Sequence, residues 1–331
     1  MLARLSAALL GAALFAGAAS AEDTTIKFKL GWTTQGSDAA FFYAKDNGYF
    51  KEEGLNVTIM PSKGTADAIR TVVTGGAEFG FIDIPSLVAA GGAGSVVKIV
   101  AANYQKPPYC VFSIDNGANI DGAKKLAGLE LGSSSASFMP KIWQAIMEMN
   151  GVDSKTMKIV NIDAPARVPM LASRKVQSID LFLMSEPSIK RAITDGKPVC
   201  LFAGDLGLEI YANSIGVHED FLKKDPEVVK KFVRAALRGW KYTFEHPDEA
   251  AQVELQYVKA LDPKIIVEEI EILRRVAITP EVQKNGYGSM TLERMKTTVD
   301  FINSHIDVPG EKLTVEQIYA PGYLPATPIT P

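Results

Sequence analysis

The pattern of hydrophobic and polar positions along this chain predicts β-strands that alternate with α-helices. After residue 21, short apolar runs typical of buried β-strands occur at residues 26–31, 55–60 and 79–82. Helical spacing separates them at residues 39–48 and 66–74, where Ser37 or Asp38 caps the first helix and Gly75 ends the second. This succession predicts an α/β fold with mixed, mostly parallel sheets.

A second unit of the same kind begins after residue 108. Its strands are expected at residues 109–114, 130–132, 158–161 and 179–182. One helix is expected after Ser135 and another after Pro165. Beyond about Tyr211 the pattern becomes helical, with helices expected at residues 226–240, 248–259, 263–276 and 291–305. The two units predict two lobes of one molecule, with a cleft between them.

The first 21 residues differ in composition from the rest. Arg4 supplies one positive charge, a small apolar run follows, and Ala19, Ser20 and Ala21 form a small-residue cleavage site. This pattern predicts a signal peptide cleaved after Ala21, which places the mature protein in the periplasm. No later run approaches the roughly 20 apolar residues of a membrane-spanning helix. Because Glu22 rather than cysteine follows the site, no lipid anchor is expected.

Charge and cysteine content narrow the classes of partner. The 331 residues include 35 Lys and Arg against 38 Asp and Glu, a net charge of -3. With no basic excess to neutralise a phosphate backbone, nucleic acid is not expected as a partner. The two cysteines, Cys110 and Cys200, would meet an oxidising compartment and could form a disulfide, or could remain two buried thiols.

Several motifs follow one another in a fixed order: KLGW at residues 29–32, AFFYA at 40–44, NGYFKEEGLNV at 47–57, GGAEFG at 75–80, VQSID at 176–180, SEP at 185–187 and DPE at 225–227. Together they resemble the periplasmic solute-binding proteins of the nitrate, sulfonate, taurine and thiamine-pyrimidine group, the NMT1/THI5-like proteins. Arg174 and Lys175 depart from the pattern, since many relatives have glycine before the valine. We expect this departure to alter a local turn outside the cleft.

The resemblance implies a two-lobed, type II periplasmic binding protein fold. Lobe 1 would comprise residues 22–108 and 213–331, and lobe 2 residues 109–212. A small solute would bind in the cleft by closure of the lobes and be delivered to the permease and ATPase of an ABC importer. The resemblance also implies a monomer that carries out no chemistry and needs no cofactor or metal.

Candidate ligand-binding residues in the first unit follow its strands. Trp32 comes directly after the first strand, where its ring could stack on a planar ligand or serve as a core or rim residue. Phe41 and Phe42 are adjacent on one helix and cannot share a face, so one is expected in the core, which leaves Phe42 as a cleft candidate. Gly64 and Thr65 form a turn whose free N–H groups could hold an oxygen or simply cap a helix.

Serine hydroxyls and a carboxylate supply further candidates. Ser133, Ser134 and Ser135 follow a strand, where hydroxyl and amide groups could bind a carboxylate, sulfonate or phosphate. A plain helix cap needs only one of them. Asp83 also ends a strand. It could accept a hydrogen bond from a ligand amino group, or it could be the N-cap of the next helix.

Three more candidates come from the first crossover and from turns of the second unit. Asn103 lies near the first crossover, where hinge and ligand contacts coincide. Asp163 and Glu186 each lie at a turn, where either side chain could point into the cleft. The alternative for the first is an arginine–carboxylate pair between Arg167 and Asp163 that braces the lobe.

Catalytic alternatives have little support. The three histidines are far apart in the sequence, the serine run lacks a Gly-x-Ser-x-Gly elbow, and no Walker-type phosphate loop is present. A thiamine-pyrimidine synthase is similar in fold, but that resemblance would demand a cysteine-rich motif. A ligand-sensing subunit for a membrane receptor is a second alternative. The solute stays open, because Trp32 favours a planar molecule and the serines favour an acid group.

Overall fold

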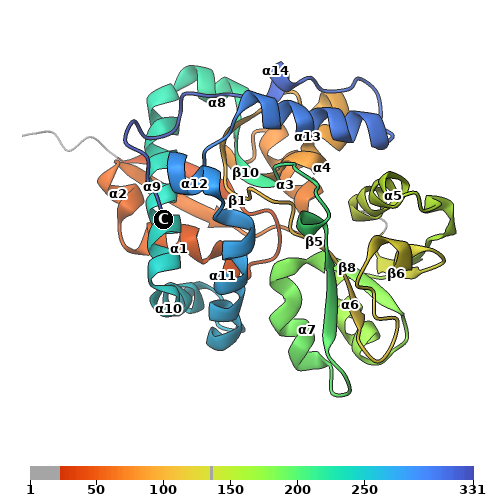
Figure 1. Ribbon diagram of the computed structural model, residues 1–331. Coiled ribbons are helices and arrows are strands. Elements are labelled where there is room, and N and C mark those ends of the chain that lie inside the picture. The colour runs from red at the N-terminus through yellow and green to blue at the C-terminus, as the bar shows by residue number, and fades with distance from the viewer. Residues whose placement is uncertain (1–22, 135–136) are drawn as a thin grey trace, which may run out of the picture.

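A computed structural model describes residues 23–134 and 137–331, so the expected signal peptide and Ser135 lie outside the described residues. Figure 1 shows two bodies, one built around strands β1 and β10 and the other around β5, β6 and β8. We call them lobe 1 and lobe 2. In the part of the chain that the structure describes, no helix is both long and apolar enough to cross a bilayer.

Lobe 1 contains the first of two five-stranded sheets. Its strands are β1 (Thr24–Lys29), β2 (Leu55–Met60), β3 (Phe79–Asp83), β4 (Val97–Ala102) and β10 (Asn213–His218), in the order β2-β1-β3-β10-β4. Strand β1 runs parallel to β2 and β3, and β10 runs antiparallel to β3 and β4. The carboxyl ends of β1, β2 and β3 therefore meet at one edge, where open α/β sheets bind ligands.

Lobe 2 contains the second sheet. Its strands are β5 (Tyr109–Ile114), β6 (Glu130–Ser133), β7 (Lys158–Asn161), β8 (Ser178–Phe182) and β9 (Pro198–Phe202), in the order β7-β6-β8-β5-β9. Strand β6 is parallel to β7 and β8, whereas β5 is antiparallel to β8 and β9. The chain thus crosses between the lobes twice, after β4 and after β9.

The predicted α/β fold with mixed sheets is confirmed, but parallel pairing is less dominant than expected. The pairs β1–β2, β1–β3, β6–β7 and β6–β8 are parallel, and the other four pairs are antiparallel. The reason is the double crossover, since β5 and β10 enter their sheets from the opposite lobe. Strand β10 was not expected, because the pattern beyond about Tyr211 is mainly helical and polar Asn213 and Ser214 precede only a short apolar stretch.

The helices cover both sheets. The longer ones are α1 (Ala39–Asp46), α3 (Thr65–Val73), α5 (Met139–Met149), α6 (Ala164–Ala172), α9 (Pro226–Glu245), α10 (Pro247–Tyr257), α11 (Pro263–Ala277) and α13 (Leu292–His305). Shorter ones are α2 (Tyr49–Glu52), α4 (Ile84–Ala89), α7 (Glu186–Ala192), α8 (Glu219–Lys224), α12 (Pro280–Asn285) and α14 (Val315–Ile318). In Figure 1 all helices from α8 onward lie on lobe 1.

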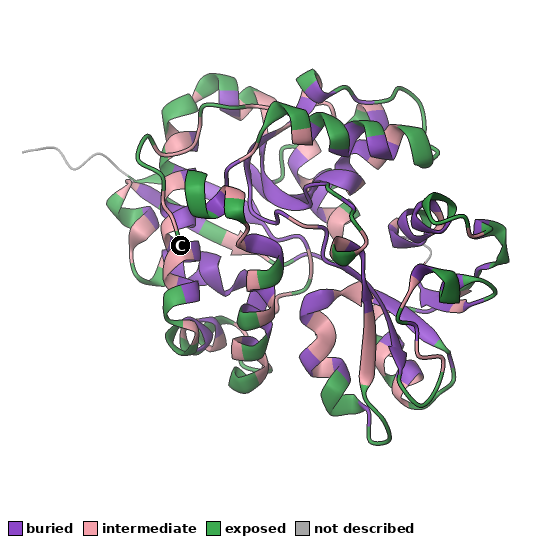
Figure 2. Ribbon diagram, in the orientation of Figure 1, coloured by how far each residue is buried: buried purple, intermediate pink, exposed green. Residues whose placement is uncertain are grey.

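An aromatic core holds the helices against the sheet of lobe 1. The ring of Phe79 on β3 stacks on Phe232 of α9 at 4.0 Å between centroids, and Phe28 packs on Phe41 at 4.6 Å. At Gly239, α9 approaches α1 so closely that a Cβ atom would lie 2.3 Å from the Ala40 carbonyl oxygen. Figure 2 shows the buried residues along the strands and the inward helix faces. The strand ends that border the cleft therefore rest on a densely packed support.

The turn at Arg174 keeps a glycine-like backbone. Arg174 has a φ of 58°, in the left-handed region that glycine adopts without strain. Its guanidinium group donates to Asn116 and forms an ion pair with Asp195 at 3.1 Å. The arginine thus adopts the backbone conformation favoured by glycine, and its side chain is held by these contacts.

Cys110 on β5 and Cys200 on β9 form a disulfide, with their Cα atoms 5.5 Å apart. The structure thereby decides between the two alternatives left open by the sequence. We expect replacement of both cysteines by serine to lower the free energy of unfolding by about 2–4 kcal/mol, because the bond closes a long loop in the unfolded chain. Urea unfolding with and without reductant measures this. Reductant should destabilise the wild type and leave the double variant unchanged, and equal midpoints for the two oxidised proteins would contradict the prediction.

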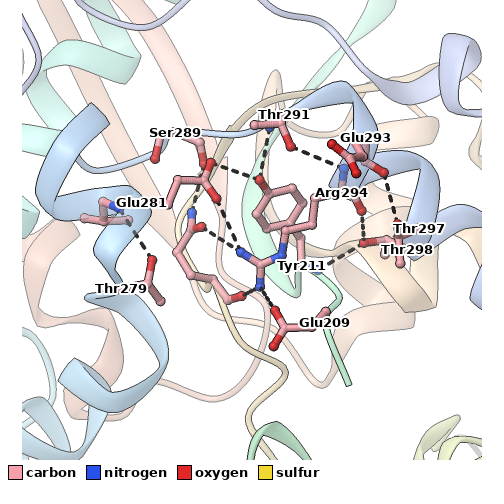
Figure 3. Close-up of polar contacts among 12 residues, drawn as sticks. Glu209, Tyr211, Thr279, Glu281, Ser289, Thr291, Glu293, Arg294, Thr297 and Thr298 are labelled. Atoms are coloured by element: carbon pink, nitrogen blue, oxygen red, sulfur yellow. Dashed lines mark hydrogen bonds and ion pairs between the residues drawn. The ribbon is translucent and has the colours of Figure 1, made fainter. Parts of the chain in front are cut away.

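The two crossovers are held against lobe 1 by Arg294 of α13 (Figure 3). Its guanidinium group donates to the backbone and side-chain oxygens of Gln105 in the first crossover. It also lies 3.6 Å from Glu209 and 4.5 Å from the ring centroid of Tyr211, both in the second crossover. Tyr211 is fixed in turn by the backbone N–H of Thr291, which donates to its hydroxyl group. The lobe 1 ends of both crossovers are therefore anchored at one place.

Candidate functional site

A cavity of about 960 Å³ is bordered by both lobes. Its lobe 1 wall comes from the ends of β1 and β3, the beginning of α3, the first crossover and the first residue of β10. Its lobe 2 wall comes from the beginnings of α5 and α6 and the end of β8. The volume lies at the upper end of the range for small-molecule sites. The strand ends thus converge on one candidate ligand site.

Trp32 and Gly64 form one side of the lobe 1 wall. Because β1 and β2 are parallel neighbours, the loops after them meet, and the Ser62 N–H donates to the Trp32 carbonyl oxygen at 3.1 Å. Gly64 has a φ of 142°, and a Cβ atom there would lie 3.1 Å from the Trp32 ring. Glycine therefore lets the indole lie across the turn. The turn leads directly into α3, so its free N–H groups adjoin the ring.

The floor of the cavity in lobe 1 is acidic. Asp38, which ends a short 3-10 helix, is 3% exposed and lines the cavity, as do Tyr104 and Asn213. One carboxylate oxygen of Asp38 accepts a hydrogen bond from the Gln35 N–H at 3.1 Å. Burial raises the pKa of Asp38 to about 7. The carboxyl group therefore titrates near neutral pH.

Two further buried carboxyl groups lie behind this floor. Glu269 of α11 accepts a hydrogen bond from the Gly36 N–H at 2.6 Å, and burial raises the pKa of Glu269 to about 8. Glu254 of α10 is fully buried, neither of its oxygens has a hydrogen-bond partner in the described chain, and burial raises its pKa well above the usual value. Repulsion from Asp38 adds to the shifts of both glutamates. We call Asp38, Glu254 and Glu269 the acid cluster.

A buried ion pair braces the lobe 2 wall. Arg167 of α6 lines the cavity and donates from Nη1 to Asp180 of β8, at 2.9 Å to both the carboxylate and the backbone oxygen. Ser133 donates to the other carboxylate oxygen of Asp180 at 2.6 Å. Burial raises the pKa of Asp180 to about 6 although the guanidinium group opposes the shift. The partner of Arg167 is thus Asp180 and not Asp163, the alternative offered by the sequence.

Five predicted site residues border the cavity: Trp32, Gly64, Thr65, Ser134 and Asp163. Ser134 precedes α5, and Asp163 occupies the N-cap position of α6. The cavity therefore brings together candidates from both lobes, and the two most distant in the sequence, Trp32 and Asp163, are 131 residues apart. Ser135 lies outside the described residues.

Five other candidates lie away from the cavity lining. Phe42 is buried against Tyr257, with ring centroids 4.8 Å apart, so both adjacent phenylalanines belong to the core. Asp83 is the N-cap of α4, as its alternative role predicted, and accepts hydrogen bonds from the Ser86 N–H and the Tyr109 hydroxyl at 2.8 Å each. Ser133 holds Asp180 as described above.

The remaining two were expected at a hinge and a turn. Asn103 is buried behind the cavity, where its N–H donates to the Asn213 carbonyl oxygen. Glu186 is half-buried at the start of α7 and does not border the cavity. Each is the chain neighbour of a residue that lines the cavity, Tyr104 for Asn103 and Ser185 for Glu186.

Sequence reasoning missed several lining residues. Asp38 was interpreted only as a helix cap, although it lies beyond the same strand end as Trp32. Asn213 could not be found because β10 itself was not predicted. Phe81 and Phe182 were treated only as strand residues, yet both line the cavity. Among the described residues, no group of three or more His, Cys, Asp or Glu side chains is placed to hold a metal.

Comparisons with known proteins agree with this architecture. A family profile described as NMT1/THI5 like matches residues 36–250. The formylaminopyrimidine-binding protein of Halalkalibacterium halodurans is 23% identical over 285 residues, 85% of each chain. The 4-amino-5-hydroxymethyl-2-methylpyrimidine phosphate synthase of Legionella pneumophila is 24% identical over 319 residues, 94% of this chain and 96% of that one.

Solved structures extend the likeness to the fold. The alkanesulfonate-binding protein of Xanthomonas axonopodis pv. citri, bound to MOPS, superposes with a TM-score of 0.70 at 12% identity, covering 91% of this chain and all of that one. The predicted two-lobed periplasmic binding protein fold is thereby confirmed.

Proposed function

This chain belongs to the NMT1/THI5-like family, and from that premise we propose that it is an extracytoplasmic solute-binding protein. More specifically, we propose that it is the periplasmic subunit of an ABC importer. It captures a small planar or anionic organic solute of the sulfonate, aromatic carboxylate or pyrimidine type and delivers it to the permease and ATPase. The observation that carries the proposal is the cavity bordered by Trp32 and by helix N-termini of both lobes.

The mechanism is closure of the lobes around the ligand. A solute that contacts both walls has more contacts in the closed form, so its binding shifts the population toward closure. The crossovers after β4 and β9 are the hinge segments of this motion, and we place the lobe boundaries near residues 108 and 212. Arg294 fixes the lobe 1 end of each segment, which confines the movement to residues beyond Gln105 and before Tyr211.

The wall chemistry favours a planar ligand with an acceptor or acid group. The face of Trp32 offers a stacking surface. The beginnings of α3, α5 and α6 border the cavity, and the N-terminal end of each helix carries partial positive charge. Ser134 and Ser137 add hydroxyl groups beside α5.

The alternative is a pyrimidine synthase, as the Legionella relative is named. The cysteines of this chain argue against it, because Cys110 and Cys200 are joined to each other within the sheet of lobe 2 and supply no cysteine-rich motif. A sensor subunit would differ in its membrane partner. Genes for a permease and an ATPase beside this one support import, and a gene for a receptor kinase supports sensing.

A thermal-shift screen of residues 22–331 tests the proposal. The panel contains aromatic acids, alkyl sulfonates, nitrate, bicarbonate and thiamine pyrimidines. A ligand at 100 times its dissociation constant should add about 2.7 kcal/mol of stability. Conversion of a pyrimidine precursor by the purified protein would support the synthase instead, and a protein free of bound solute that responds to nothing in the panel would contradict the solute classes proposed.

We expect Trp32→Ala to weaken binding of the solute found in this screen by more than tenfold, because the ligand loses its stacking surface. Isothermal titration calorimetry measures the change. Trp32→Phe is the matched control, since it keeps an aromatic face and should lose less. Unaltered affinity in a folded Trp32→Ala protein would remove the indole from the site.

A further inference from the structure

The contacts between the lobes differ from one side of the cleft to the other. On one side, α11 of lobe 1 packs against α7 of lobe 2 and against the 3-10 helix Leu183–Ser185 that precedes it. Leu183 and Met184 of that helix are fully buried, in one apolar cluster with Ile266 and Ile270 of α11. Separating the lobes here would expose these side chains to water, which is unfavourable.

Polar contacts reinforce this α7–α11 contact at both ends of α11. Arg191 of α7 forms an ion pair with Asp262, the N-cap of α11. Near the carboxyl end of α11, the guanidinium group of Arg275 lies 5.2 Å from the ring centroid of Phe202, the last residue of β9. The same group lies 3.3 Å from Asp205. Helix α11 therefore holds lobe 2 along its whole length.

The first crossover runs beside the α7–α11 contact. The Gln105 N–H donates to the carbonyl oxygen of Val276 in α11 at 2.7 Å, and the Leu183 N–H of lobe 2 donates to the carbonyl oxygen of Pro108 at 2.7 Å. Between these two attachments lie Pro107 and Pro108, and proline fixes φ. This crossover is therefore short and stiff.

The second crossover contains a more flexible position. Gly207 is exposed and has a φ of 77°, and among the described residues nothing lies within 4 Å of the place that a Cβ atom would take. Glycine changes its backbone dihedrals at little cost. This crossover can therefore take up a rotation that the prolines of the first crossover resist.

The side of the cleft at α5 is joined more weakly. There α5 of lobe 2 faces α13 of lobe 1 (Figure 1). The Lys141 ammonium group donates to the Asp307 carbonyl oxygen at 3.4 Å, and both residues are exposed. A hydrogen bond of this length between exposed groups breaks at little cost. Lys141 and Pro309 also line the cavity, and we call this edge of the cavity the mouth.

We propose that the lobes pivot at the α7–α11 contact and that the cleft opens at the mouth, so that the solute enters and leaves past Lys141. Lys141 is a positioning residue in this motion, because its ammonium group reaches from α5 to lobe 1 and stabilises the closed arrangement. The proposal rests on the solute-binding function and deepens it, since it specifies which side of the cleft moves and names a residue that acts on closure.

Distances between spin labels in the solute-free protein test the pivot. One pair of labels lies across the mouth, at the exposed positions Glu148 and Glu311, and the other lies across the α7–α11 contact, at the exposed positions Lys190 and Glu268. The labels are attached to non-natural amino acids, so that the disulfide stays intact. Electron paramagnetic resonance of the full mature chain should give two populations of distances for the mouth pair and a single narrow one for the other pair.

Lys141→Met tests the role of the lysine. The variant loses the contact with Asp307, and its ratio of open to closed protein at the mouth pair should rise about 1.5- to 5-fold, the range expected for an exposed charged contact. Lys155→Met is the matched control, because Lys155 is an exposed lysine of lobe 2 away from the cavity lining. It should leave the ratio as in the wild type.

The wild-type comparison does not depend on the folding of any variant. Equally wide distributions for the two pairs, or a wider one across the α7–α11 contact, would overturn the pivot. The same ratio of open to closed protein in Lys141→Met and in the wild type would overturn the role of Lys141. Because these measurements use no solute, either result leaves the cavity as a candidate solute site, and a solute screen without a response leaves the measured movement standing.

Discussion

Replacing Arg167 with methionine should lower the free energy of unfolding of the ligand-free protein by about 3–5 kcal/mol at pH 8. The side chains of Arg167 and Asp180 are 3% and 0% exposed, so the carboxylate would remain buried without its cation. Methionine keeps much of the aliphatic volume, which limits the contribution of a cavity. Chemical unfolding of the two proteins measures the difference.

The pH dependence of that loss identifies its cause. Without the guanidinium group, the pKa of Asp180 should rise further above about 6, and the carboxyl group can then take up a proton. The cost of the variant should therefore be smaller at pH 5 than at pH 8. The double variant Arg167→Met with Asp180→Asn should recover much of the stability at pH 8, since it buries no charge. A loss that is equal at both pH values and not recovered in the double variant would mean that packing, not charge, is responsible.

This ion pair also marks the limit of what the sequence could predict. From the sequence, a bracing role for Arg167 is one of two alternatives, with Asp163, four residues away, as its partner. The true partner lies on β8, and pairing across a sheet depends on strand order, which local periodicity does not contain. The disulfide stayed open for the same reason, because nothing local indicates that β5 and β9 are neighbours.

Part of the site was predictable because the carboxyl ends of parallel strands meet at one edge of a sheet, where ligands bind. Trp32 and Gly64 follow strands that local pattern identifies, so their common edge could be inferred. Ser134 and Asp163 follow from the same rule in lobe 2. Asn213 begins a strand whose polar start resembles a loop, and that strand forms only because β3 and β4 supply partners.

The acid cluster predicts that the ligand-free protein is more stable in mild acid than at slightly alkaline pH. The pKa values in the folded protein are raised to about 7 for Asp38 and about 8 for Glu269, and that of Glu254 is raised well above its usual value. Between about pH 4 and pH 8 the folded state therefore binds more protons than the unfolded state. Stability contributed by these groups is fully present below their unfolded pKa values and is lost as pH rises through the folded ones.

We expect the free energy of unfolding to fall by several kcal/mol from pH 5 to pH 8, since one unit of pKa difference corresponds to about 1.4 kcal/mol. The raised pKa of Asp180 acts in the same direction. The lowered pKa of Asp67, about 2, acts only below this window, where its ion pair with Lys29 is lost. Urea unfolding of the ligand-free protein at several pH values gives the slope.

Variants of the acid cluster test whether its carboxyl groups cause this dependence of the free energy of unfolding on pH. Glu269→Gln keeps an acceptor for the Gly36 N–H but cannot ionise, so it should reduce the slope and raise stability at pH 8 relative to the wild type. Asp38→Asn should do the same, and the exposed Asp248→Asn should not. A wild-type stability that is flat or rises between pH 5 and pH 8 would show that the carboxyl groups ionise without cost.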